Sequence, residues 1–288
     1  MASYRIVDRG GQRDILGEGL LWSARDNAVY WTDILAPALN RLSLADGTVR
    51  RWPIPEYIGW VIERRGGGLI AGLKTGFWEL DLEPFALRHI VNPHPPEHPD
   101  NRMNDAKADD KGRIWAGSMP FGLDKPSGGL YRLDPDRSLH QMDAGYYVAN
   151  GPTFSLDQRF IFHTDTVRSL VYRFAMHDDG SLGPRETFIT FEPEWGRPDG
   201  MTTDAEGHLW IAHWSGSRIS RFTPDGKLER SIPLPASQIT NVCFAGPALD
   251  RMFVTCAAEN REQEAAAGSL FEILDHGARG LPPGQFAG

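Results

Sequence analysis

The stretch RPDGMTTDAEGHLWIAHW, residues 197–214, joins an Asp-Gly pair to an apolar–polar alternation, a turn and a Trp-centred apolar run. A second stretch, RMNDAKADDKGRIWAGSM (102–119), has the same layout, with Asn104 where the first has Asp199. Alternation of period two is typical of β-strands, and a Gly-containing turn between two such strands predicts a hairpin. The chain therefore repeats at least one hairpin unit.

The apolar run at the end of this hairpin recurs six times, at intervals of 40 to 48 residues. The central residues of the six runs are Tyr30, Ile70, Trp115, Phe162, Trp210 and Phe253. A period in this range, with β-branched and aromatic alternation, is typical of propeller blades. We predict an all-β, six-bladed β-propeller with four-stranded antiparallel blades around a central channel, as a single domain of residues 1–288. A two-sheet sandwich, the alternative, would not require such regular spacing.

Each repeat unit has an equivalent position about one short hairpin before its central residue, near the start of its first strand. In five of the six units this position holds a carboxylate or a carboxamide. The residues at this station are Glu18, Ile58 (or Gly59), Asn104, Asn150, Asp199 and Asn241. The innermost strand of a propeller blade lines the channel, so these side chains are expected to converge on one axis. An all-oxygen set suits Ca²⁺, Mg²⁺ or Mn²⁺, and Zn²⁺ or Fe²⁺ less typically. The alternative is that Asn and Asp begin strands because they favour turns.

Bulk composition excludes several classes of partner. The net charge is −8, whereas nucleic acid and anionic membranes both require a cationic face. Two cysteines, Cys243 and Cys256, are too few for a disulfide framework and are expected to be buried in strands. The N-terminal residues lack the apolar core of a secretion signal. We expect a cytoplasmic protein with no nucleic-acid, membrane or obligate protein partner.

Five motifs, in order along residues 14–288, together resemble the SMP-30/gluconolactonase/regucalcin family. They are GEGLLW, NRMNDAKAD, ANGPTFSLD, PDGMTTDAEGHLW and the C-terminal FAG. The resemblance implies a six-bladed propeller that binds one divalent metal ion and hydrolyses a sugar lactone, as a carboxylic-ester hydrolase of carbohydrate catabolism. Ca²⁺ is the expected ion, with Zn²⁺, Mn²⁺, Mg²⁺ or Fe²⁺ as alternatives.

Carried over by motif, the metal ligands are Glu18, Asn150 and Asp199, and Arg102 and Asn104 hold the substrate. The free oxygen of Asp199 could also take a proton from the attacking water. Gly122 replaces an acidic residue of the animal relatives, so the preferred sugar is left open. Two other functions are open as well: a non-enzymatic calcium-binding regulator, and a related aryl-ester or phosphotriester hydrolase, which would need a more apolar mouth.

The second strand of each hairpin returns to the channel mouth and brings further candidates to it. These are Asp33, Lys74, Met119, Asp165, His213 and Trp214. We expect His213 and Trp214 to bind substrate, because an aromatic face suits the apolar side of a sugar ring; a structural histidine is the alternative. Arg102 could instead form a surface ion pair with Asp105 or Asp109. Trp31, Trp115 and Trp210 are expected to repeat in register and to pack between blades.

Overall fold

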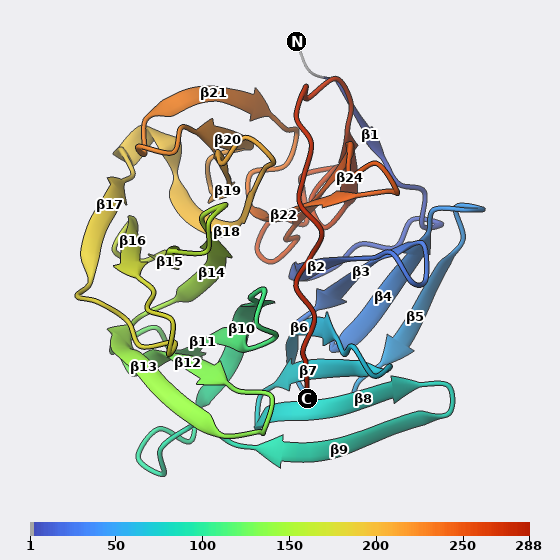
Figure 1. Cartoon of the computed structure of the whole chain (residues 1–288). Helices are drawn as coiled ribbons and strands as arrows, with labels where there is room; N and C mark the ends of the chain where they lie inside the picture. The colour runs from blue at the N-terminus through green and yellow to red at the C-terminus, as the bar shows by residue number, and fades with distance from the viewer. Residues whose placement is uncertain (1–2) are drawn as a thin grey trace.

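The computed structural model describes residues 3–288. These residues form six four-stranded antiparallel sheets arranged around one axis (Figure 1). Blade 1 contains β2 (Gly17–Ser23), β3 (Ala28–Asp33), β4 (Ala38–Ser43) and β5 (Val49–Pro53). Blade 2 contains β6 (Ile58–Glu63), β7 (Leu69–Leu73), β8 (Gly76–Leu82) and β9 (Phe85–Val91). Blade 3 contains β10 (Asn101–Ala108), β11 (Ile114–Pro120), β12 (Gly128–Leu133) and β13 (Leu139–Tyr146).

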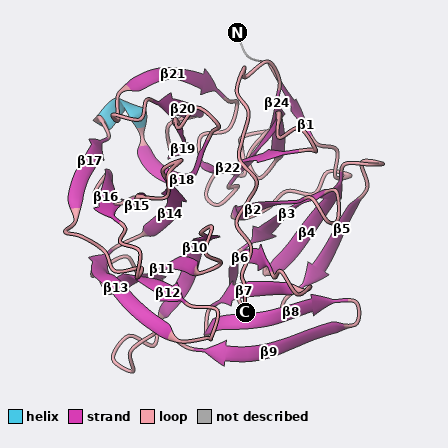
Figure 2. Ribbon diagram, viewed as in Figure 1, coloured by secondary structure: helices cyan, strands magenta, loops and turns pink. Residues whose placement is uncertain are grey.

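The remaining blades follow the same plan. Blade 4 contains β14 (Ala149–Phe154), β15 (Phe160–Asp165), β16 (Leu170–Ala175) and β17 (Glu186–Thr190). Blade 5 contains β18 (Arg197–Thr203), β19 (Leu209–Trp214), β20 (Arg218–Phe222) and β21 (Leu228–Pro233), and a short 3-10 turn, η1 (Pro193–Trp195), precedes it (Figure 2). Blade 6 contains β22 (Ile239–Ala245), β23 (Arg251–Cys256), β24 (Leu270–Ile273) and β1 (Tyr4–Ile6). The predicted six-bladed propeller is confirmed.

Both ends of the chain close the ring. Strand β1 pairs with β24, so the first residues of the chain supply the outer strand of the last blade. The C-terminal segment crosses the end of the channel (Figure 1), where residues 281–284 line a cavity of about 170 Å³. Its backbone bonds to three blades through Gly280, Phe286 and Ala287. No helix in residues 3–288 is long and apolar enough to span a bilayer.

Every innermost strand has a register irregularity at the predicted channel station. The shifts lie between Glu18 and Leu21, Ile58 and Trp60, Met103 and Ala106, Asn150 and Thr153, Pro198 and Met201, and Ile239 and Asn241. Such bulges re-aim side chains and are common beside functional sites. Gly19 (φ 58°) and Gly151 (φ 72°) take the left-handed conformation this requires. At Gly19 a Cβ would lie 2.4 Å from the Gly59 carbonyl oxygen, so only glycine fits there.

The three tryptophans are buried between blades, as predicted, but they do not share one register. Trp115 shares an apolar cluster with Ala149 of the following blade, and Trp210 shares one with Val242 of the following blade. Trp31 packs against Phe253 of the preceding blade, because it lies one position further along its strand and successive side chains point to opposite faces. The residue of blade 1 that corresponds to Trp115 and Trp210 is Tyr30.

A carboxylate in the turn between the first two strands fixes the aromatic residue at this register. Asp204 accepts hydrogen bonds from Trp210 Nε1 (2.9 Å) and Arg221 Nε (2.8 Å). In blade 3, Asp109 accepts bonds from Trp115 Nε1 (2.9 Å) and Arg113 Nε (2.6 Å). Buried charges are tolerated when they are paired and hydrogen-bonded, and these carboxylates meet both conditions.

Substitution of Asp204 by alanine is expected to lower the free energy of unfolding by about 3 kcal/mol, because it leaves the Trp210 indole and the Arg221 guanidinium without their buried acceptor. Asp178→Ala removes a fully exposed carboxylate and serves as the matched control. Urea unfolding followed by tryptophan fluorescence measures both variants. Equal midpoints for the two would show that the buried carboxylate does not stabilise the blade.

Candidate functional site

Four blades bring the predicted oxygen-bearing side chains into direct contact at one end of the channel. Asn104 Nδ2 donates to Asn150 Oδ1 (2.9 Å), and Asn241 Nδ2 donates to Glu18 Oε2 (3.0 Å). All four side chains are almost completely buried. The first bond joins blades 3 and 4, the second joins blades 6 and 1, and Asn241 Nδ2 also donates to Asp105 Oδ2 of blade 3 (3.2 Å), so the station identified by counting is one physical site.

Asp199 of blade 5 completes the cluster with a second buried carboxylate. It lies within hydrogen-bonding reach of Glu18, and burial together with the Glu18 charge raises the pKa of Asp199 well above its usual range. Burial also raises the pKa of Glu18, and the nearby Asp105 carboxylate adds to this shift. Asp199 Oδ1 has no hydrogen-bond partner in the described chain. Two adjacent buried carboxylates with a bare oxygen form a strong attractor for a cation.

Arg102 lies beside this carboxylate pair and is only 5% exposed. Its Nη1 donates to Asn104 Oδ1 (2.6 Å) and to the Met103 carbonyl oxygen (3.1 Å), whereas its buried Nε has no partner in residues 3–288. Burial lowers its pKa to about 10, opposed by the negative charges of Glu18, Glu259 and Asp199, so the guanidinium remains charged at neutral pH. Arg102 is therefore buried in the site, not on the surface in an ion pair.

The orientation of the Asn150 amide is set by a residue that the sequence did not reveal. Asn150 Nδ2 donates to Thr166 Oγ1 (2.9 Å), and the same hydroxyl donates to the Pro198 carbonyl oxygen (2.7 Å). Because the amide nitrogen is used in this way, Asn150 Oδ1 points back toward Asn104 with a lone pair to spare. Thr166 also links blade 4 to the strand that carries Asp199.

Asp105 is a third carboxylate of the cluster and was not predicted as a site residue. It accepts a bond from Asn241 Nδ2 (3.2 Å), and burial raises its pKa. Adjacent strand residues normally face opposite ways, but the bulge in β10 turns both Asn104 and Asp105 toward the cluster. The only signal in the sequence was the Asn-Asp pair of RMND, next to a residue already chosen.

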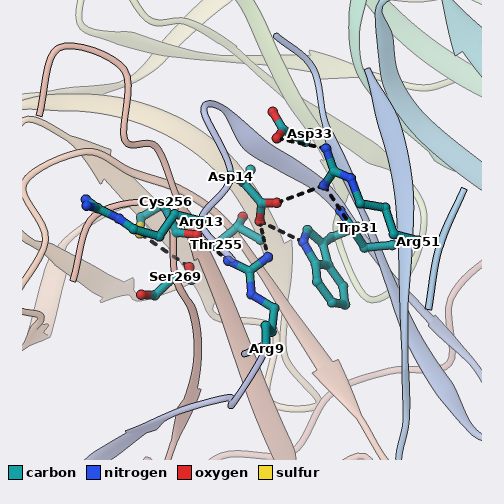
Figure 3. A network of polar contacts seen from close by, with 12 residues as sticks. Arg9, Arg13, Asp14, Trp31, Asp33, Arg51, Thr255, Cys256 and Ser269 are labelled. Carbon is teal, nitrogen blue, oxygen red and sulfur yellow. Dashed lines mark hydrogen bonds and ion pairs between the residues drawn. The ribbon is translucent and has the colours of Figure 1, made fainter. Parts of the chain in front are cut away.

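A network at the start of blade 1 holds the strand that carries Glu18 (Figure 3). Asp14 accepts bonds from Arg9 (2.7 Å) and the Trp31 indole (2.9 Å), and burial raises its pKa. Asp33 accepts bonds from the Leu16 amide (3.1 Å) and from Arg51 (3.3 Å). Asp33, proposed from sequence as a rim residue, therefore fixes the backbone just before Glu18.

Asp165 performs the corresponding task in blade 4. It is fully buried and accepts bonds from the Tyr147 amide (3.2 Å) and from Arg168 (2.6 Å). Met119 is buried opposite Arg102 in the β10–β11 pair. Asp33, Asp165 and Met119 are therefore buried residues that hold the strands of the channel mouth in place.

The two aromatic candidates of blade 5 lie in different surroundings. His213 is completely buried against Phe191, its Nδ1 contacts the Trp195 carbonyl oxygen (2.7 Å), and burial lowers its pKa to about 4. These contacts are those of the structural-histidine alternative, although His213 Nε2 has no hydrogen-bond partner in the described residues, so its role in substrate binding stays a prediction. Trp214 is half-buried at the rim and lines a surface cavity with Phe191 and Arg197.

Residues 3–288 contain no group of three or more His, Cys, Asp or Glu side chains arranged to hold a metal ion. The predicted ligand set differs from such a group, because it combines two carboxylates with the Asn150 carboxamide. Cys243 and Cys256 are both free and buried. Burial raises the pKa of each thiol to about 12, which excludes either one as a thiolate nucleophile at neutral pH.

Comparison with known proteins gives matches along most of the chain. The family model SMP-30/Gluconolactonase/LRE-like region matches residues 16–258. A 6-deoxy-6-sulfogluconolactonase of Pseudomonas putida is 37% identical over 89% of this chain and 88% of its own. A pentonolactonase of Haloferax volcanii is 32% identical over 98% and 97% of the two chains. The crystal structure of a calcium-binding protein, regucalcin, from Agrobacterium tumefaciens superposes with a TM-score of 0.92 at 25% identity, covering 99% and 97% of the chains.

The reactivity of the Cys243 and Cys256 thiols tests whether both side chains are buried in blade 6. Native protein at pH 8 is expected not to react with a disulfide reagent such as dithionitrobenzoate over an hour, since both thiols are buried and protonated. Unfolding in guanidinium should release two reactive thiols per chain. Rapid reaction of the native protein would contradict the buried positions of Cys243 and Cys256.

Proposed function

The chain belongs to the SMP-30/gluconolactonase/LRE-like family, and from this premise we propose that it hydrolyses a sugar lactone to the open aldonic acid with the help of one divalent cation. Lactonases among its relatives support the reaction class. The observation that carries the proposal is the pairing of Glu18 with Asp199, two buried carboxylates with one bare oxygen. Burial of such a pair is costly unless a positive charge joins it.

The donor set fits a hard divalent ion. Glu18 and Asp199 provide anionic oxygens, and Asn150 provides a neutral one whose direction is fixed by Thr166. Oxygen-only sets of this kind suit Ca²⁺ and related cations. When bound, such a cation would polarise the lactone carbonyl and stabilise negative charge on its oxygen.

The chain's own residues bind and orient the substrate. Arg102 and Asn104 are already joined by a hydrogen bond, which leaves the guanidinium Nε and one terminal nitrogen for substrate oxygens. A planar guanidinium with several donors suits two neighbouring oxygens on one sugar. Asn104 is held in turn by the Ala149 carbonyl oxygen (2.8 Å), so the pair is positioned before substrate arrives.

The oxygen of Asp199 that does not bind the cation is the expected proton acceptor. Water adds to the carbonyl carbon, the bond between that carbon and the ring oxygen breaks, and the ring oxygen takes up a proton. That free carboxylate oxygen would receive the proton of the attacking water and return it to the leaving ring oxygen. Sugar lactones are reactive esters, so a modest lowering of the barrier suffices; about 1.4 kcal/mol already gives a tenfold rate increase.

Removal of the cation or of either carboxylate is expected to lower kcat/KM for the best aldonolactone at least a hundredfold. The measurement is lactone hydrolysis followed by acid release, with excess chelator, and with Glu18→Gln and Asp199→Asn at saturating metal. Asp178→Asn is the control, because it removes one exposed carboxylate far from the channel mouth. Hydrolysis that continues at the same rate in chelator and in both variants would refute the proposed metal-dependent function.

A calcium-binding protein without enzymatic activity is the second candidate, and the Agrobacterium regucalcin structure is the observation that favours it. Such a protein would need the ring carboxylates but not the substrate-binding pair. Arg102→Met is therefore expected to abolish most lactone hydrolysis while calcium affinity changes less than threefold. Calorimetric titration of Ca²⁺ alongside the activity measurement decides between the candidates: a wild-type protein that binds Ca²⁺ but hydrolyses none of the lactones would favour the binding protein.

A further inference from the structure

Blade 2 is the only blade that contributes no oxygen-bearing side chain to the ring within residues 3–288. Its station is Ile58–Gly59, and the backbone there is packed so closely that a Cβ on Gly59 would lie 2.4 Å from the Asn104 carbonyl oxygen. Above this station the loops of blade 2 instead bring Tyr57 and Lys74 to the channel mouth, joined by a bond from the Lys74 amide to the Tyr57 carbonyl oxygen (2.8 Å). At blade 2 the mouth therefore presents an aromatic and a cationic side chain, whereas the other blades present carboxylates or carboxamides.

Aromatic and cationic groups from blades 2 and 3 meet on that side. Lys74 Nζ lies 5.9 Å from the centre of the Phe121 ring, and the Arg102 guanidinium lies 5.4 Å from the same centre. Tyr57 packs against Phe121 with ring centres 4.7 Å apart. We call Tyr57, Lys74, Arg102 and Phe121 the cationic rim. Two positive side chains sharing one ring at the mouth of a channel form a surface suited to an anion.

The cationic rim keeps its positive charge available. The contact of Lys74 Nζ within residues 3–288 is with the Phe121 ring, not with a carboxylate, and the Nε of the buried Arg102 has no hydrogen-bond partner there. Glu56, an acidic residue of the loop before β6, accepts a hydrogen bond from Thr75. Glu259 is the acidic group of the opposite loop whose charge reaches Arg102. Under the proposed function, the ring carboxylates Glu18 and Asp199 would face the cation instead of the rim.

His94 holds the loop on this side of the mouth and adds no charge to it. Its Nε2 contacts the Lys74 carbonyl oxygen (3.0 Å), and burial lowers its pKa to about 4, so the ring is neutral at pH 7. It holds the loop that presents Lys74. The positive charge of the rim therefore comes from Lys74 and Arg102 alone.

We propose that the cationic rim binds an anionic group at the end of the sugar remote from the lactone carbonyl, so that the preferred substrate is an acidic sugar lactone bearing a carboxylate, sulfonate or phosphate. This rests on the proposed lactone hydrolysis: with the lactone carbonyl at Glu18, Asn150 and Asp199, the far end of the sugar would extend past Arg102 toward blade 2. Lys74 is the selectivity residue, and Arg102 bridges the two regions.

The charge chemistry favours an anion over a hydroxyl at this place. Hydrogen bonds between an ammonium or guanidinium and an anion are about twice as strong as neutral ones. A sugar hydroxyl would leave the Lys74 charge uncompensated as the mouth fills. Because the rim is partly open to water, the preference should weaken as salt screens it. A tenfold preference for the anionic lactone is the expected scale.

The test compares kcat/KM for matched lactones with and without a terminal anion: glucono-lactone against its 6-phosphate, its 6-sulfonate and the corresponding aldaric monolactone. Wild-type protein with saturating metal should favour the anionic members about tenfold, and the ratio should shrink between 10 mM and 500 mM salt. The three anions distinguish which acidic group fits best.

Lys74→Met is expected to reduce this ratio about tenfold, mainly through KM, while Lys74→Arg retains it. Lys227→Met is the matched control, since it removes the same charge from an exposed side chain paired with Asp225 in the β20–β21 turn. Lys227→Met should leave the ratio and the activity unchanged. A ratio that is the same in Lys74→Met and wild type would overturn the inference.

The outcomes distinguish failure of the acidic-substrate inference from failure of the proposed lactone hydrolysis. Chelator-sensitive hydrolysis of neutral and anionic lactones at equal rates would overturn the acidic-substrate inference and leave the proposed function standing. Absence of hydrolysis for every lactone of the set would overturn both. Preference for the anionic members that persists at high salt and in Lys74→Met would place the selectivity elsewhere in the site, and would also overturn the role of Lys74.

Discussion

The burial of two like charges in one place is the constraint on which the rest of the structure depends. Glu18 and Asp199 come from the first and fifth blades and are almost completely buried; burial raises both pKa values, with the Asp105 charge adding to the shift of Glu18 and the Glu18 and Asp105 charges to that of Asp199. Left to itself such a pair destabilises the fold. The surrounding network of Asn104, Asn150, Thr166 and Asn241 fixes the oxygens in position, and a bound cation would remove the repulsion.

The propeller supplies this geometry by repetition. Six innermost strands converge on one axis, and each has an irregularity at the point where a side chain must turn into the channel. Glycines in the left-handed region make two of these bulges possible. Closure by β1 and the C-terminal segment then prevents the ring from opening, so distances between blades stay fixed. Stability and site geometry are consequences of the same closure.

Period and composition were enough to predict the propeller and five of the channel-lining residues, because strand alternation and blade repetition are both readable from sequence. Features that depend on a departure from the regular strand pattern could not be predicted from the sequence. Asp105 joins the cluster only because a bulge breaks the alternation, and Trp31 faces the preceding blade because of a shift by one residue. His213 was chosen for its place near the rim, yet its side chain points into an aromatic cluster. Loop contacts such as that of Lys74 with Phe121 have no sequence signature.

The central claim is that oxygens from three separate blades share one cation. The most direct measurement is a crystal structure of the protein grown with Ca²⁺, with the ion identified from its anomalous signal. The account predicts one ion per chain within about 2.6 Å of Glu18, Asn150 and Asp199 oxygens. A channel mouth holding no ion at saturating Ca²⁺, or an ion bound by other residues while Glu18 and Asp199 stay protonated and paired, would contradict it.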